Sequence, residues 1–310
     1  MVFLRGITLA AMLGSMACHR ATPTTCTPAQ FGLAESFKGR ATIERAIAKA
    51  DAVLGGTSGF AFSPGWLDRP PKTRKLPVYI VDASAVAATE SAFAAGNADC
   101  VFINSDINDR IGRMFGQATE GTFEVDPIDA IALILLHEAG HFHYGDAGDF
   151  APSAPLQLDT LVEDLNTDKN KELRADRYAG DLIRAAETDP PRATAVLDLS
   201  LCLTNISWNL LHGRLIDNFG ATTLSSPSVF RDNGDSHPNL ELRFLVLQYS
   251  VTRQEIALAN IREFLGHRRE ATAGGGVLYG GSALQSGGDY HLLDDGSKKA
   301  TSPAKSDRSK

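Results

Sequence analysis

The apolar run 131–136 constrains the fold of this chain more than any other feature. Asp126-Pro127 and Asp129 precede it and are typical of a helix start, because Asp caps free backbone N–H groups and proline suits the first turn. Gly145 is typical of a helix end. A helix that is apolar on all sides has no face for water. We therefore predict a buried helix between Asp126 and Gly145.

The same helix carries a short motif of ionisable residues. Positions 137–141 read His-Glu-Ala-Gly-His, and side chains four residues apart share one face of a helix. His137 and His141 can therefore bind one Zn²⁺, while Glu138, one step round the helix, reaches a water on that metal. Such residues would be costly to bury in an apolar helix without a partner. The motif predicts a hydrolytic metal site.

A polar segment at 170–180 is the candidate source of a third ligand, since a catalytic zinc keeps three protein ligands and one open position. Glu172 and Asp176 are four apart and share a helix face. One carboxylate can ligate zinc while the other orients a ligand histidine through its free ring nitrogen. Taken alone, the segment is better explained as a solvated charged helix face. His143 points to the opposite side of the first helix, and we interpret it as a partner for nearby structure.

The order of these motifs resembles a known family. His-Glu-x-x-His followed by Glu-x-x-x-Asp resembles the gluzincin metallopeptidases, and Glu-Leu-Arg-Ala-Asp-Arg at 172–177 is similar to their HtpX-type and CAAX-prenyl-endopeptidase family. His237-Pro238, with Arg243 following, resembles the family's His-Pro-x-x-x-x-Arg signature. Segment 76–105 resembles its strand, its Asn-Ala-Phe-Ala box and its edge strand, so the likeness runs from about 76 to 243.

The chain departs from the family pattern in two places. Ser91 stands where Asn is usual, and no transmembrane hairpin lies between His141 and Glu172. The second departure favours the soluble branch of the family that is located in the cell envelope. The resemblance implies an α+β, mainly helical fold, with a gluzincin-like zinc metallopeptidase domain and a small β-sheet.

The resemblance also implies the roles of the site residues. One Zn²⁺ per chain would be held by His137, His141 and Glu172, and Glu138 would assist the attack of a zinc-bound water on a peptide bond. Asp176 would support the ligands from behind. The expected function is that of a zinc-dependent endopeptidase acting on protein or peptide substrates in the bacterial cell envelope.

Two further roles follow from the resemblance. His237 would donate a hydrogen bond to the oxyanion of the transition state, with Arg243 in place to hold its loop. Val101, Phe102 and Ile103 would lie on an edge strand that binds substrate. The pattern of these three residues fits an ordinary core strand equally well.

The two ends of the chain predict export and an appended tail. Residues 1–17 combine Arg5, an apolar stretch and small residues, which is typical of a secretory signal peptide. Cys18 suits lipidation, while Ser15 and Ala17 suit ordinary cleavage, so the mature protein is expected in the periplasm or as a membrane-anchored lipoprotein. We divide the rest into an N-terminal linker at 18–40, the metallopeptidase domain at 41–268 and a disordered Gly/Ser/Lys-rich tail at 269–310.

The cysteines and the composition set further bounds. In an oxidising compartment Cys26, Cys100 and Cys202 can pair, but the connectivity cannot be read from their spacing. The net charge of −7 comes without a basic or aromatic-interleaved groove, so we expect no nucleic-acid partner. Membrane contact is expected only through a lipid at Cys18.

The remaining periodicity predicts mostly helices. Apolar spacing indicates helices at 42–54, 239–251 and 254–265, and a long one after Pro191 in which Trp208 belongs to the core. Short β-rich runs indicate strands at 76–81 and 100–104, with a proline-rich connection at 59–75. The acidic stretch 146–168 is interpreted as a solvated lid that borders the cleft, although a calcium site is conceivable.

Two other functions fit the same residues. In an exported chaperone-like or autoinhibited protein the zinc would be structural, and His237 could supply a fourth ligand that closes the site to water. An envelope amidohydrolase acting on a non-peptide amide would use the same chemistry, and the sequence does not separate it from a peptidase.

Overall fold

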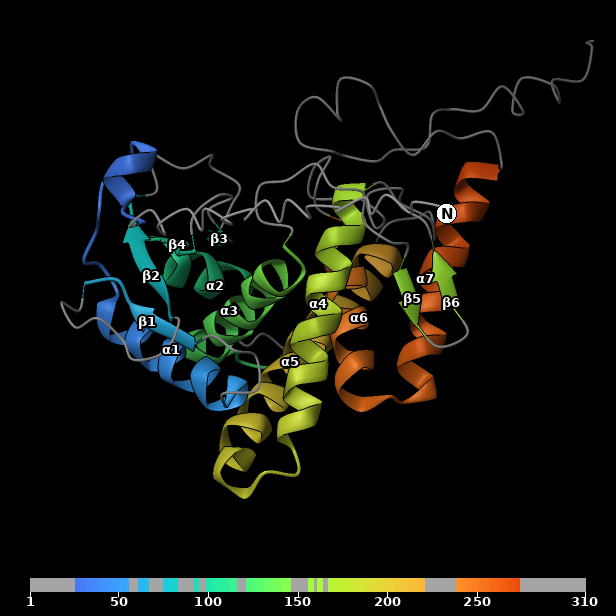
Figure 1. Cartoon of the computed structure of the whole chain (residues 1–310). Helices are drawn as coiled ribbons and strands as arrows, with labels where there is room; N and C mark the ends of the chain where they lie inside the picture. The colour runs from blue at the N-terminus through green and yellow to red at the C-terminus, as the bar shows by residue number, and fades with distance from the viewer. Residues whose placement is uncertain are drawn as a thin grey trace, which may run out of the picture.

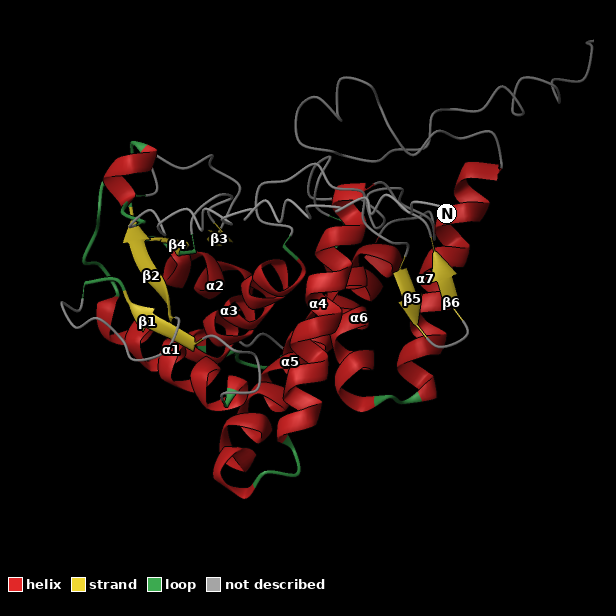
Figure 2. Ribbon diagram, viewed as in Figure 1, coloured by secondary structure: helices red, strands yellow, loops and turns green. Residues whose placement is uncertain are grey.

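The computed structural model describes residues 26–55, 61–66, 75–82, 92–94, 99–115, 121–145, 156–158, 161–163, 167–220 and 238–273. Within this part of the chain the fold is α+β and mainly helical, as predicted (Figure 2). The helices are α1 (Arg40–Leu54), α2 (Ile107–Phe115), α3 (Pro127–Tyr144), α4 (Thr167–Ala186), α5 (Ala193–Gly220), α6 (Leu240–Thr252) and α7 (Glu255–Ala273). The strands are β1 (Ala61–Pro64), β2 (Lys75–Val81), β3 (Ala92–Ala94), β4 (Val101–Asn104), β5 (Leu156–Leu158) and β6 (Leu161–Glu163).

Four of the strands form a small mixed sheet. Its order is β1-β2-β4-β3, with β1, β2 and β4 parallel and β3 antiparallel to β4. Val78 of β2 pairs with Val101 of β4, and Ala92 of β3 pairs with Ile103. The two edges of the described sheet are therefore β1 and β3, while β4 lies inside it.

Helix α3 lies at the centre of the main core. It contacts α1, α2, α4 and α5, and strand β3 lies against it (Figure 1). Its apolar residues, such as Ile131 and Leu135, are fully buried, as expected for a helix without a polar face. This burial on several sides is what holds the histidine motif at a defined place in the protein.

Helix α4 connects the main core to a second one. Ala179 and Ile183 pack with the main core, whereas Leu173 belongs to a cluster with α6 and α7. Figure 1 shows α4 standing between the part of the fold that contains the sheet and the pair α6–α7, with the β5–β6 hairpin beside that pair. Leu158 of this hairpin is fully buried in the second core. At least this part of the stretch predicted as a solvated lid is therefore packed.

The segment before α1 is attached to the sheet. A short 3₁₀ helix (Pro28–Phe31) is followed by a bridge between Glu35 and Val81, and a disulfide joins Cys26 to Cys100 at the start of β4. The described end of the predicted linker thus carries structure. The disulfide also decides the pairing that the sequence left open, because Cys202 is free and buried.

Local signals placed several elements correctly. Helix α1 ends at Gly55, which has a φ of 50°, and α6 begins after Asn239, whose side chain accepts hydrogen bonds from the first turn.

Helix α7 runs to Ala273, past the predicted boundary at 268. The signal peptide, Cys18 and residues 274–310 lie outside the described residues.

Two predictions about elements were wrong. The proline-rich connection contains strand β1, which is possible because Pro64 ends an edge strand, where a missing N–H costs no ladder bond. Trp208 does not belong to the core: it is 46% exposed, and its indole nitrogen donates a hydrogen bond to the Gly121 carbonyl. Helical spacing alone placed it on the wrong side of α5.

Candidate metal centre

Helix α3 begins and ends where the sequence predicted. The Asp126 side chain accepts a hydrogen bond of 2.8 Å from the backbone N–H of Ile128, and Pro127 occupies the first turn. Gly145 ends the helix with a φ of 69°, a conformation that glycine adopts without steric cost. These two residues fix where the helix begins and ends, and within it His137 and His141 lie four residues apart on one face.

The two histidines meet Glu172 from α4. The Nε2 atoms of His137 and His141 are 3.0 Å apart, and they lie 3.3 and 3.4 Å from the two carboxylate oxygens of Glu172. One donor atom from each of the three residues lies within 4.8 Å of the others, so the group can hold a metal ion. This convergence confirms the proximity that the sequence predicted for these residues.

The spacing of the donors can be tested against an ion of known size. A tetrahedral zinc with bonds of about 2.0–2.1 Å separates its ligand atoms by about 3.3 Å. The separation of 3.0 Å between the two histidine nitrogens is close to this edge length, and the distances of 3.3 and 3.4 Å join each nitrogen to a different oxygen of Glu172. All three side chains are nearly buried, with 10–13% of their surface exposed. The three side chains can therefore hold a metal ion, and imidazole and carboxylate donors are among those that zinc accepts.

Asp176 and Arg243 support the cluster from behind. Asp176 Oδ1 lies 2.7 Å from Nδ1 of His137, which leaves the Nε2 atom of that ring facing Glu172 and His141. Arg243, from α6, donates to both oxygens of Asp176, at 2.9 Å through Nε and 3.1 Å through Nη2. Its Nη2 also lies 3.4 Å from Glu172. Three helices thus contribute to one buried, charged network.

The pKa values in the network are shifted by burial and by its opposite charges. Burial raises the pKa of Glu172 and Asp176, but Arg243 and the histidines outweigh it, so that the pKa of Glu172 falls well below its usual range and that of Asp176 is also lowered. Burial and Arg243 lower the pKa of His137, yet Asp176 and Glu172 raise it to about 10. Two carboxylates and the Arg243 guanidinium, whose Nη2 lies 3.1 and 3.2 Å from the two ring nitrogens, thus surround His137.

Glu138 lies next to the ligands on α3. Its side chain is buried, and its charge raises the pKa of Arg243, although burial and the two other carboxylates act more strongly on that residue. The motif thus places a buried carboxylate beside the candidate ligands.

Gly140 was not interpreted from the sequence, although it lies inside the motif. It is the point at which α3 touches the backbone of α4 at Ala175. Small residues at 140, 175 and 179 were the available signal, because helices approach closely where side chains are small. Their approach brings Glu172 within reach of the histidines.

The structure corrects the placement of Val101, Phe102 and Ile103. They lie on β4, between β2 and β3, and their side chains are fully buried. The edge that lies against α3 is β3, at Ala92–Ala94. The mistake has a physical cause: a buried strand and a strand at a sheet edge can carry the same apolar residues, and only pairing distinguishes them.

The other candidate residues lie as follows. His143 stacks on Tyr178 of α4, with ring centroids 4.3 Å apart and an interplanar angle of 21°, which agrees with its interpretation as a structural partner. His237 lies outside the described residues. The described partners of Arg243 are Asp176, Glu172 and His137, so its predicted hold on the His237 loop stays a prediction.

Among the described helices, none is long and apolar enough to cross a membrane. Comparison of the chain with models of protein families, with curated proteins and with solved structures found no match.

Proposed function

We propose that this protein is a zinc-dependent endopeptidase of the gluzincin type that acts in the bacterial cell envelope. The observation that carries the proposal is the convergence of His137, His141 and Glu172 within reach of one metal ion, with Glu138 buried beside them. Three ligands leave one position of a tetrahedral ion open, which is the arrangement of catalytic sites.

The residues of the chain divide the chemistry among them. A bound zinc would polarise the substrate carbonyl and lower the pKa of a water molecule. Glu138 takes the proton of the attacking water and passes it to the leaving amine. Asp176 holds the tautomer of His137, and Arg243 keeps Asp176 ionised and oriented. His237 is proposed to stabilise the oxyanion.

The position of strand β3 at an edge of the described sheet supports the proposal that the substrate is a peptide. It pairs with β4 on one side, and among the described strands no other pairs with it, so its second side can accept an extended chain by backbone hydrogen bonds. Strand β3 lies against α3, the helix that carries the histidine motif. Main-chain recognition of this kind requires a polypeptide and not a small amide.

The disulfide supports an oxidising location. Disulfides persist outside the cytosol and are rare within it. The Cys26–Cys100 bond therefore agrees with export by the signal peptide at 1–17, either to the periplasm or to the membrane through a lipid at Cys18.

The decisive experiment compares zinc content and hydrolysis in matched variants. Wild-type protein and Glu138→Gln should both bind one zinc, while Glu138→Gln should lose about a hundredfold or more of its activity on casein, because the amide cannot accept a proton. Glu124→Gln, on the exposed surface, serves as the matched control and should retain activity.

Four outcomes would contradict the proposal. Three of them are a wild-type protein without zinc, activity of Glu138→Gln within a few-fold of wild type, and hydrolysis of small acyl amides but not of casein. The last would favour the amidohydrolase. A zinc-loaded wild type that cleaves neither substrate would favour the autoinhibited or chaperone-like protein.

A further inference from the structure

A group of exposed hydrophobic side chains lies on α5, near the N-terminal end of α3. Of the eight large hydrophobic side chains that are exposed in the described part of the chain, four gather on one side of α5. We call them the α5 face: Leu197, Leu201, Phe123 and Trp208. Leu197, Leu201 and Trp208 recur at helical spacing and form one stripe. Gathered apolar side chains of this kind mark interaction sites, whereas scattered ones need no explanation.

The aromatic end of the face is held in place. Trp208 and Phe123 pack edge to face, with ring centroids 6.3 Å apart. Asn209 bonds both backbone groups of Phe123, at 2.8 Å to its N–H and 2.7 Å to its carbonyl. These bonds fix the backbone of Phe123, and the ring contact holds its side chain against Trp208. The exposed aromatic pair therefore has a defined position at the surface.

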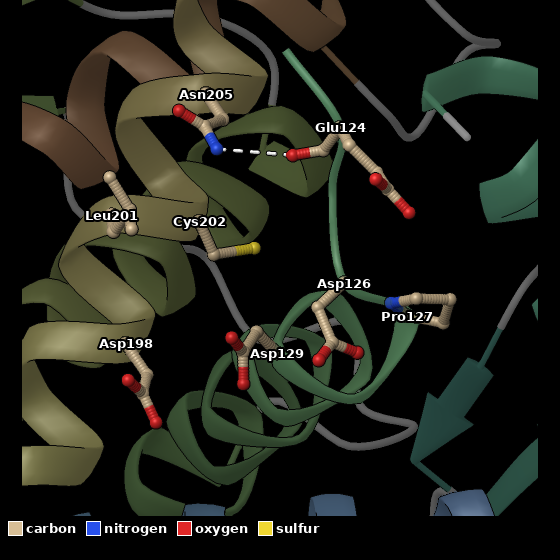
Figure 3. A pocket seen from close by; sticks show the side chains of 8 residues that line it. All are labelled: Glu124, Asp126, Pro127, Asp129, Asp198, Leu201, Cys202 and Asn205. Carbon is tan, nitrogen blue, oxygen red and sulfur yellow. Dashed lines mark hydrogen bonds between the residues drawn. The ribbon is translucent and has the colours of Figure 1, made fainter. Parts of the chain in front are cut away.

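An acidic hollow adjoins the stripe. It has a volume of about 500 Å³, and Figure 3 shows side chains from α3 and α5 around it. Its lining includes four carboxylates: Glu124, Asp126, Asp129 and Asp198. Leu201 belongs both to this lining and to the exposed stripe, so the two features are continuous.

The charge of the hollow is only partly compensated. Lys49 bonds Asp129 and lies 2.7 Å from Asp198, so one cation serves two carboxylates. Asp126 caps α3, and the Glu124 side chain is exposed. Within the described residues, the α5 face and the adjoining hollow therefore combine apolar contact area with excess negative charge. A partner that is complementary to them is apolar and positively charged.

We propose that the α5 face docks a cationic, amphipathic protein segment. Its apolar side chains would cover Leu197, Leu201 and Trp208, and a Lys or Arg would enter the acidic hollow. A second copy of this chain would bring two acidic hollows together, and an anionic lipid surface would be repelled for the same reason. Asp126 caps α3, and His137 lies 11 residues further along, or roughly 16 Å at 1.5 Å per residue, so the docking site is separate from the metal site.

Binding can be followed through Trp208 itself. The chain has two tryptophans, and Trp66→Phe leaves Trp208 as the reporter of fluorescence. The probes are two synthetic helical peptides with the same leucines, one with lysine and one with glutamate at all polar positions. We expect saturable binding of the lysine peptide, weaker at high salt, and no comparable binding of the glutamate peptide.

Variants locate the site. Leu197→Ser with Leu201→Ser should weaken binding of the lysine peptide about tenfold or more, as expected for residues at the centre of an interface. Glu124→Gln should weaken it by a smaller factor, and only at low salt. Ile256→Ser, an equally exposed residue on α7, is the matched control and should change nothing. Circular dichroism checks that each variant is folded.

The proposal is overturned if both peptides bind alike, or if the double leucine variant binds as tightly as its parent. A dimer in size-exclusion chromatography that the double variant abolishes would assign the face to a second copy, and would overturn it too.

Discussion

A Cβ atom on Gly140 would lie 2.7 Å from the Cα atom of Ala175, which is closer than Cβ contacts in proteins. The third position after His137 is therefore a glycine because two helix backbones meet there. Glu172, one turn before Asp176 on the same helix, reaches the histidines only when α3 and α4 are this close. The packing of two backbones thus sets the dimensions of the metal site.

Gly140→Ala should separate the helices and loosen the site. We expect a loss of about 1–3 kcal/mol in stability, as for other overpacked cores, and weaker zinc binding than in the wild type. Thermal unfolding and zinc analysis measure the two effects. Gly112→Ala, in α2, is the control: a Cβ there meets nothing within 4 Å, so the change should be neutral or stabilising. Wild-type zinc affinity in Gly140→Ala would show that the contact does not govern the site.

Glu172→Ala should abolish stoichiometric zinc binding, since two imidazoles remain of three ligands. Zinc analysis after dialysis is the measurement. Glu187→Ala, just beyond the end of α4 and exposed, should keep one zinc per chain. Full zinc content in Glu172→Ala would remove this residue from the ligand set.

Asp176→Ala should lower zinc affinity by about ten- to a hundredfold, because His137 loses the partner that fixes its ring. Arg243→Ala should act in the same direction through Asp176. Competition with a chelator gives both affinities. If Arg243→Ala weakens zinc binding also when Asp176 is already alanine, Arg243 acts by another route.

Lys49→Met should destabilise the protein by about 3 kcal/mol at neutral pH, since it leaves the buried Asp129 without its cation. Burial raises the pKa of Asp129 even though Lys49 lowers it, so this carboxylate takes up its proton at a higher pH in the folded protein than in the unfolded chain. The defect should therefore shrink as the pH falls and Asp129 becomes protonated. Urea unfolding of wild type and variant at several pH values tests this. A defect that is constant between neutral and acid pH would contradict it.

His237→Ala should lower kcat about a hundredfold or more with little change in KM or zinc content, if the imidazole acts on the oxyanion. Steady-state kinetics with zinc analysis distinguishes the alternatives. Loss of zinc would make His237 a fourth ligand. Unchanged kcat, KM and zinc content would show that His237 has no role in catalysis.

Local chemistry in the sequence was enough for the main helix of the site. Asp126, Pro127 and Gly145 act on the backbone within a few residues, so their effect on the ends of α3 can be read directly. The spacing of His137 and His141 follows from helix geometry in the same way. Glu172 was also identified from spacing, because it shares a helix face with Asp176. The upstream motif, which requires a third ligand, made this segment the candidate.

Tertiary structure alone decided the relations between segments that are distant in the chain. The pairing of Cys26 with Cys100, the interior position of β4, and the bond of Arg243 to Asp176 each join residues that no local pattern links. The exposure of Trp208 depends likewise on which side of α5 the core covers. Helical and strand periodicity reports which residues share a face, but it does not report what that face meets. The sequence therefore identified the candidate ligands, and the packing of α3 against α4 determined that they meet.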